Sequence, residues 1–244
     1  MRTLLSERFA PVTSAIGFLE LPLEQALQEL SLWTRSLYSA VSIERLSGGL
    51  ATLLPRLEPL TGGSRPRELL VEVGPRWTAY FDCSLRGTDA VSAIGHLSRT
   101  VPCQGVAIRC VPRVPASGSR PPRFGSVQFE LFGPLQTAFL NYVRTVSVTF
   151  SGSKWEFCAT GTEQAFEERD AYRSKRVRDR FTSEMLERYC RAIGIDPFVA
   201  ESYGPNAVLL ESAVPPALGG SVMTIAETQR WIGIEPGAAD ELPG

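Results

Sequence analysis

This chain of 244 residues has very little histidine and no clustered cysteines. It contains one histidine, His96, and five cysteines that are scattered and never spaced as CxxC. Common zinc sites need several such ligands, and no loop has the regular acidic spacing of a calcium hand. We therefore expect neither a metal nor a cofactor. The cysteines lie in or beside apolar patterns, which indicates buried or half-buried free thiols in a reducing cytosol; the alternative is one disulfide-bonded pair.

Catalytic motifs are also missing. Ser-His-Asp or Cys-His chemistry would have to use His96, which lies on a predicted helix, and the chain has no GxSxG elbow. The glycine pairs at 48–49, 62–63 and 219–220 lack the lysine of a phosphate-binding loop. We expect no catalytic residue and interpret His96 as a structural or surface residue, which favours a protein that is not an enzyme.

Neither an excess charge nor a long apolar run is present. The formal net charge is −1, which argues against a nucleic-acid-binding protein but leaves a local basic patch open. No apolar stretch approaches the roughly 20 residues that span a bilayer, and residues 9–19 are too interrupted for a signal peptide. The expectation is a cytoplasmic protein that binds neither a membrane nor a nucleic acid.

The clearest structural signal lies between residues 146 and 193. Apolar residues alternate along 146–150 and 155–159, and Ser151-Gly152-Ser153 between them predicts a β-hairpin. Residues 182–193 then carry one apolar stripe at helical spacing, with Thr182 as the expected N-cap and Gly194 after the end. A second helical pattern surrounds residues 170–180.

Further patterns predict helices over 22–41, 88–97 and 224–234, and strands over 69–73, 77–81, 106–111, 124–132 and 207–211. Together they predict an α+β fold in which antiparallel strand pairs are covered by helices on one face. The alternative is two related α+β halves, residues 1–112 and 124–244, separated by a proline-rich loop or linker at 113–123. Trp77 and Trp155, which each begin a second hairpin strand, support that alternative.

The first candidate site is the turn that holds Asp82, Arg86 and Asp89. It lies where a predicted strand ends and a helix begins, a place where polar groups can converge on a ligand. The structural interpretation is that Asp89 caps the helix and Arg86 neutralises Asp82.

The second candidate site is the charged segment that follows the hairpin. Its acids and bases alternate, which is typical of a solvated face with salt bridges, while arginine and tyrosine are common in protein interfaces. The candidate binding residues there are Glu167, Tyr172, Arg173, Arg176 and Arg180. For Arg178 we expect a structural tie to a nearby acid, because its neighbour Val177 indicates a buried face; for Arg180 both roles stay open.

Residues 155–167, continuing to 178–182, resemble a group of uncharacterised bacterial cytosolic proteins. Some proteins of this kind travel with secreted toxins as immunity proteins, and the resemblance covers about a quarter of the chain. It implies a binding protein that neutralises a toxin by direct contact, and it carries no functional residue with it. The alternative is an enzyme or small-molecule-binding protein that uses the turn from Asp82 to Asp89.

Overall fold

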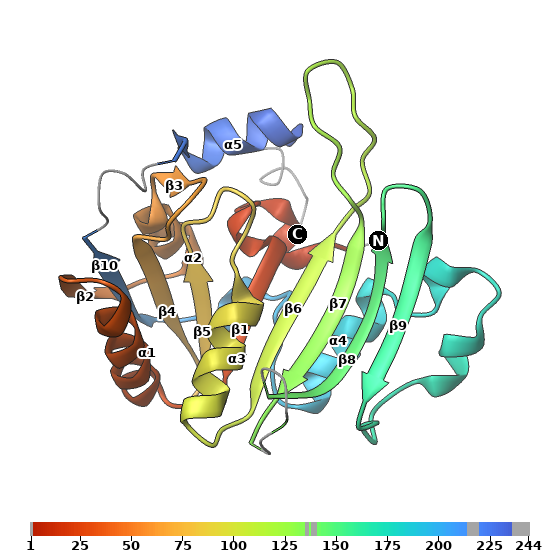
Figure 1. Cartoon of the computed structure of the whole chain (residues 1–244), viewed down its shortest axis with the longest axis horizontal. Helices are drawn as coiled ribbons and strands as arrows, with labels where there is room; N and C mark the ends of the chain where they lie inside the picture. The colour runs from red at the N-terminus through yellow and green to blue at the C-terminus, as the bar shows by residue number, and fades with distance from the viewer. Residues whose placement is uncertain (1, 135–136, 138–140, 214–219, 236–244) are drawn as a thin grey trace.

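Nine of the described strands form one antiparallel sheet in the order β2-β10-β4-β5-β1-β6-β7-β8-β9 (Figure 1). The computed structural model describes residues 2–134, 137, 141–213 and 220–235. The strands of this sheet are β1 (Ala15–Leu19), β2 (Val41–Ser47), β4 (Arg67–Val73), β5 (Trp77–Asp82), β6 (Gly105–Val111), β7 (Ser126–Phe132), β8 (Tyr142–Phe150), β9 (Trp155–Gly161) and β10 (Asn206–Ser212). Two short strands, β3 (Leu60–Thr61) and β11 (Val222–Met223), pair separately.

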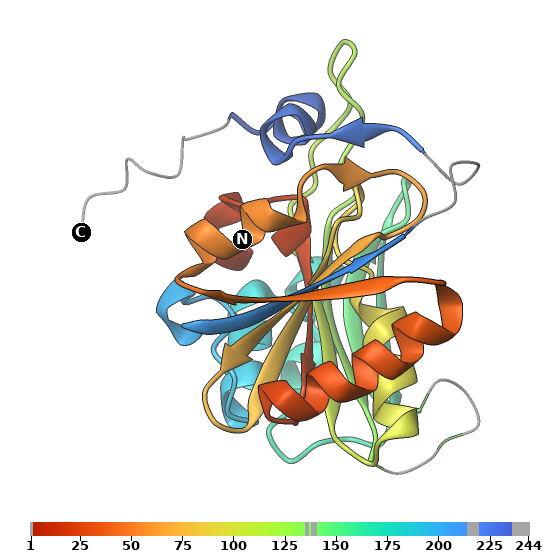
Figure 2. The same ribbon diagram turned by 90° about the vertical axis from the view of Figure 1, so that its left-hand side faces the viewer.

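The predicted α+β class with antiparallel pairing is confirmed, but helices lie against both faces of the sheet and not on one face as predicted, because each face carries its own apolar core. On one face α1 (Leu23–Leu37) and α3 (Ala90–Thr100) pack side by side (Figures 1 and 2). On the other face lies α4 (Ser183–Ala192), behind β7 in Figure 1. The short helices α2 (Leu50–Leu53) and α5 (Ile225–Ile232) and the 3-10 turns η1 (Leu4–Glu7), η2 (Val12–Ser14), η3 (Leu54–Leu57), η4 (Arg169–Arg173), η5 (Val177–Asp179) and η6 (Ala200–Ser202) complete the described elements.

Each face of the sheet has its own apolar core, because successive side chains of a strand point in opposite directions. Phe18 and Phe81 belong to the core on the α4 side, and Leu19 and Tyr80 belong to the core under α1 and α3. The α3 helix lies very close to the sheet: a Cβ at Gly17 would lie 2.6 Å from Ile94. A side chain at this position of β1 would therefore push the helix away.

Strands from both sides of the proline-rich segment belong to the same sheet. β6 pairs directly with β7 across that segment, and β10 lies between β2 and β4. Within the segment, Val114 pairs with Arg123 and Ser117 with Arg120. It forms a loop, closed by these two bridges, that projects beyond the sheet near α5 (Figure 1).

The hairpin of β8 and β9 and the helix α4 agree with the sequence pattern. Gly152 has a φ of +100° in the hairpin turn, and the Thr182 hydroxyl accepts a hydrogen bond from the Met185 N–H at 3.4 Å. The segment around 170–180 differs: it contains the two 3-10 turns η4 and η5 in place of the predicted helix. The segment contacts β9 and the acids and tyrosines described below. These tertiary contacts outweigh the local helical propensity of the segment.

Candidate functional site

Asp82 organises the turn between β5 and α3. Its side chain is fully buried, and its two carboxylate oxygens accept hydrogen bonds from the N–H groups of Ser84 and Asp89, both at 2.9 Å. Asp89 caps α3 by accepting from the Ser92 N–H at 3.3 Å. Asp82 therefore closes the turn, and the expected capping role of Asp89 is confirmed.

The cation beside Asp82 is Arg65. Its Nη1 atom lies 2.7 Å from Asp89 Oδ2 and 3.6 Å from Asp82 Oδ2. The interpretation that Arg86 neutralises Asp82 is wrong, because the Arg86 side chain is exposed and only its backbone N–H bonds within the turn. Burial raises the pKa of Asp82 to about 6, although the N–H donors of Asp89 and Ser84 and the charge of Arg65 act to lower it.

A second buried carboxylate lies beside Asp82 on the paired strand. Glu68 of β4 accepts hydrogen bonds from the Tyr80 hydroxyl at 2.8 Å and from the Thr34 hydroxyl at 3.0 Å. Burial raises the pKa of Glu68 in spite of these two donors. The network joins α1 to the sheet, so its place in the fold is structural.

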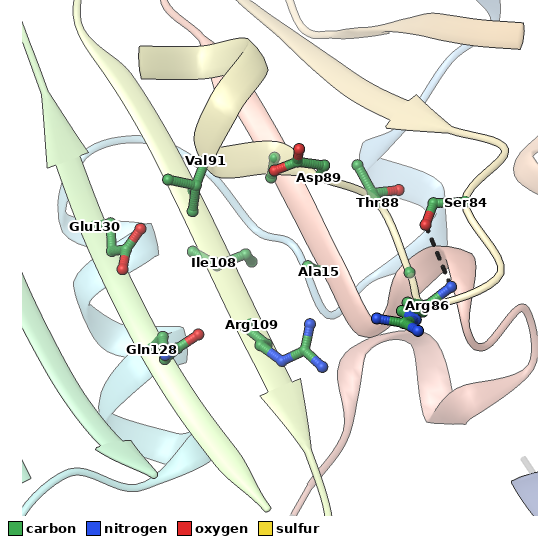
Figure 3. A pocket seen from close by; sticks show the side chains of 13 residues that line it. Ala15, Ser84, Arg86, Thr88, Asp89, Val91, Ile108, Arg109, Gln128 and Glu130 are labelled. Atoms are coloured by element: carbon green, nitrogen blue, oxygen red, sulfur yellow. Dashed lines mark hydrogen bonds between the residues drawn. The ribbon is translucent and has the colours of Figure 1, made fainter. Parts of the chain in front are cut away.

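A hollow of about 290 Å³ opens between the start of α3 and strands β1, β6 and β7 (Figure 3). Its charged and amide-bearing lining residues are Arg86, Asp89, Arg109, Gln128 and Glu130, and we call it the turn hollow. The predicted residues Arg86 and Asp89 therefore meet in one concave site. Arg109, Gln128 and Glu130 were missed; each is a polar residue within an otherwise apolar strand, and that pattern could have indicated them.

Two of these residues have unusual surroundings. The side chain of the half-buried Arg109 forms no hydrogen bond or ion pair with any described residue, and burial alone lowers the pKa of its guanidinium. Burial also raises the pKa of Glu130 to about 7, against the weak effect of the Tyr142 hydroxyl at 3.5 Å.

The segment 162–182, which we call the connector, is held to the sheet by a buried polar network. Glu167 forms a two-point ion pair with Arg144 of β8 and also accepts from the Tyr172 hydroxyl at 2.9 Å. The Tyr172 hydroxyl lies 2.8 Å from that of Tyr189 on α4. The predicted residues Glu167 and Tyr172 thus bind the connector to the rest of the fold.

The connector arginines divide into two groups. Arg180 is half-buried; its Nε donates to the Ser174 carbonyl at 2.9 Å and its guanidinium lies 5.8 Å from the Phe157 ring centroid. Arg173, Arg176 and Arg178 are exposed, and the nearest acid to Arg176 is Asp179 at 3.8 Å. The structural tie expected for Arg178 is wrong: η5 buries none of its side chains, and no described acid pairs with this arginine.

A second hollow of about 450 Å³ is lined by Arg176 and Arg178 but not by Arg173, and we call it the connector groove. Its floor is apolar and consists of Val127, Val148, Trp155 and Phe181. Its rim carries Arg113, Arg176 and Arg178 together with Asp179 and Glu184.

The turn hollow and the connector groove open on opposite faces of the sheet. Gln128 of β7 lines the hollow and its neighbour Val127 lines the groove, and adjacent residues of a strand point to opposite faces. A single flat interface therefore cannot include both candidate sites that the sequence indicates.

Among the described residues, no group of three His, Cys, Asp or Glu side chains is placed to hold a metal ion. His96 stacks on Trp33 of α1 with ring centroids 4.4 Å apart, and burial lowers the pKa of the imidazole. None of the helices in this described part of the chain combines the length and the apolar character needed to cross a bilayer.

No family model, curated protein or solved structure matches this chain.

Proposed function

We propose that this chain is a non-catalytic cytoplasmic protein that binds a protein partner, and that the partner inserts an apolar side chain flanked by acidic residues into the connector groove. The observation that carries this proposal is the combination of an apolar floor around Trp155 with the exposed arginines of the rim. A buried aromatic or aliphatic anchor surrounded by polar contacts is the usual centre of a protein interface, and arginine and tryptophan are enriched there.

The charge of the connector supports an acidic partner. Arg173, Lys175, Arg176 and Arg178 are all exposed, whereas the whole chain has a net charge of −1. Complementary charge at an interface rim steers association and suppresses wrong partners. The acids Asp179 and Glu184 on the same rim, together with the apolar floor, favour a peptide over the phosphates of a nucleic acid.

The more specific form of the proposal is an immunity protein of bacterial origin whose partner is a toxin. It depends on the resemblance of residues 155–167 and 178–182, which supply Trp155 of the groove floor and Arg178 of its rim. Co-expression of the chain with the product of the adjacent gene tests this form directly. Co-purification of the two proteins and rescue of growth by the wild-type chain, but not by the Arg178→Glu variant, are the expected results.

The general proposal is tested with a displayed library of random peptides selected on the immobilised full chain. We expect enrichment of sequences that combine an aromatic or branched aliphatic residue with neighbouring Asp or Glu. Arg178→Ala should weaken binding of such a peptide by about 2 kcal/mol, the size of an interface hot spot. Arg173→Ala is the matched control, because this arginine is exposed on the same connector but does not line the groove.

Two outcomes would refute the proposal. One is a selection that enriches no peptide, with the chain instead retarding single-stranded RNA. The other is a peptide whose affinity falls equally in Arg173→Ala and Arg178→Ala, because this would mean a general charge effect without a groove.

A further inference from the structure

The turn hollow contains two arginines that the described part of the chain leaves without an acidic partner. Arg109 projects from β6 toward the side of the hollow where Arg86 lies and away from Glu130 (Figure 3). Neither guanidinium takes part in an ion pair or side-chain hydrogen bond with the described residues. Two positive groups therefore face the same concave space.

An unpaired and half-buried guanidinium is unfavourable for the folded chain. Burial removes water from the charge, and the cost is normally offset by a carboxylate or by several hydrogen bonds. The pKa of Arg109 is lowered by burial, and no neighbouring charge acts against that effect. Elsewhere in this chain the buried cation Arg144 has a carboxylate partner, so Arg109 is an exception that calls for a ligand.

We propose that the turn hollow binds a small molecule through an oxyanion group, a carboxylate or a phosphate, that pairs with Arg109 and Arg86. Arginine presents a planar fork of N–H donors that matches both oxyanions. This site is on the opposite face from the connector groove, so the proposal is independent of the protein partner proposed above.

The other lining residues define the rest of the ligand. Gln128 is paired in register with Arg109 on the neighbouring strand, which places an amide donor beside the oxyanion. Glu130, two residues further along the same face of β7, provides an acceptor for an amine of the ligand. Asp89 also lines the hollow, but its carboxylate is paired with Arg65 at 2.7 Å and does not compete for the two arginines.

The size of the site fits this chemistry. A hollow of about 290 Å³ lies at the lower end of the range for small-molecule sites, so it suits a compact metabolite that carries an oxyanion at one end and an amine at the other. An amino acid and an aminoalkyl phosphate both have this arrangement, and the experiment separates them.

The test is an NMR titration of the full chain with two matched pairs of probes at constant ionic strength. The pairs are propionate with β-alanine, and ethyl phosphate with phosphoethanolamine; the members of each pair differ by an ammonium group. Constant ionic strength is needed because exposed charges respond to salt alone. We expect saturable shifts of the Arg109 side-chain signal, tighter binding of the member that carries the ammonium, and a preference for one oxyanion that identifies the ligand class.

Variants decide whether the shifts report this site. Arg109→Met should weaken binding about tenfold or more, because two charge-assisted hydrogen bonds are lost. Arg99→Met is the matched control, since Arg99 is an exposed arginine in the last turn of α3 and lies outside the hollow; its affinity should equal that of the parent. Glu130→Gln should remove the advantage of the ammonium while the oxyanion still binds.

Several results would overturn the inference. The absence of saturable binding for all four probes would do so, as would equal affinity in Arg109→Met and Arg99→Met. Because Arg109→Met removes an unpaired charge, the variant should fold, and its dispersed spectrum verifies this before the titration. Equal affinity for both members of each pair would show that Glu130 does not bind an amine of the ligand.

Discussion

The carboxylate of Glu167 and the guanidinium of Arg144 form a buried two-point ion pair, with Nε to Oε1 at 2.9 Å and Nη2 to Oε2 at 2.6 Å. The two side chains are only 1% and 3% exposed. Glu167 also accepts from the Gln164 N–H at 2.7 Å and from the Tyr172 hydroxyl, so its oxygens are fully used. This pair holds the start of the connector on β8 and therefore positions one wall of the connector groove.

Glu167→Gln should lower the free energy of unfolding by about 3 kcal/mol, because it leaves the charge of Arg144 buried without a carboxylate. Urea unfolding followed by tryptophan fluorescence measures the change. Glu163→Gln is the matched control: its ion pair with Arg169 is exposed, so a loss below about 1 kcal/mol is expected. Equal losses in the two variants would mean that the buried ion pair contributes no more to the free energy of unfolding than the exposed one.

Asp82 should make stability depend on pH in the acidic range. Its pKa rises from an ordinary 3.8 to about 6 on folding, so between these values the folded chain keeps a proton that the unfolded chain has released. This contribution to the free energy of unfolding is complete below about pH 4 and is lost as the pH rises through about 6.

The measurement for Asp82 compares the wild-type chain with Asp82→Asn, which cannot titrate at this position. The stability of the wild type relative to the variant should fall by up to about 3 kcal/mol between pH 4 and pH 7, from a shift of about two pKa units. Parallel stability curves would show that the carboxyl group titrates normally in the fold.

Replacement of Arg180 by alanine should destabilise the fold more than replacement of Arg178. Arg180→Ala should destabilise the chain by about 1 kcal/mol, because the hydrogen bond to the Ser174 carbonyl is lost. Arg178→Ala should change stability by less than about 0.5 kcal/mol, since the side chain is exposed. Thermal unfolding of both variants measures the difference, and a larger loss in Arg178→Ala would contradict the structure of η5.

The native chain should react with a thiol reagent at one cysteine. Cys158 on β9 is exposed, whereas the other four cysteines are buried. Burial raises the pKa of Cys103 and Cys110 to about 12, so little thiolate forms there at neutral pH. Titration with a chromogenic disulfide should release one equivalent from the native chain, almost none from Cys158→Ser, and five from the unfolded wild type. Rapid release of two or more from the native chain would indicate that a second thiol is accessible.

Local patterns predicted the elements that have one buried face. The hairpin of β8 and β9 and the helix α4 were recognised because their apolar residues repeat with the period of the element. Local chemistry was equally clear at the caps, where Thr182 and Asp89 bond to N–H groups three residues further on.

The central strand β1 escaped sequence analysis for the opposite reason. All five of its residues are buried, because β5 and β6 pair with it on either side and a core covers each face. Such a strand has no alternation to detect and is only a short, mildly apolar run. The edge strand β2 was missed because most of it is exposed, with charged residues in place of an apolar face.

The sequence by itself therefore determined the α+β class, the main hairpin, the capped helices and the turn at Asp82–Asp89. Only the tertiary structure decided which polar groups meet. Arg65 reaches Asp82 from the segment before β4, and Arg144 reaches Glu167 from β8, whereas the Arg109 side chain on β6 has no partner among the described residues. The residues of the first pair are 17 positions apart and those of the second pair are 23 positions apart. Whether such residues meet depends on strand register. Spacing along a chain reports local hydrogen bonds and periodicity, whereas the pairing of distant charges follows from the order of strands in the sheet.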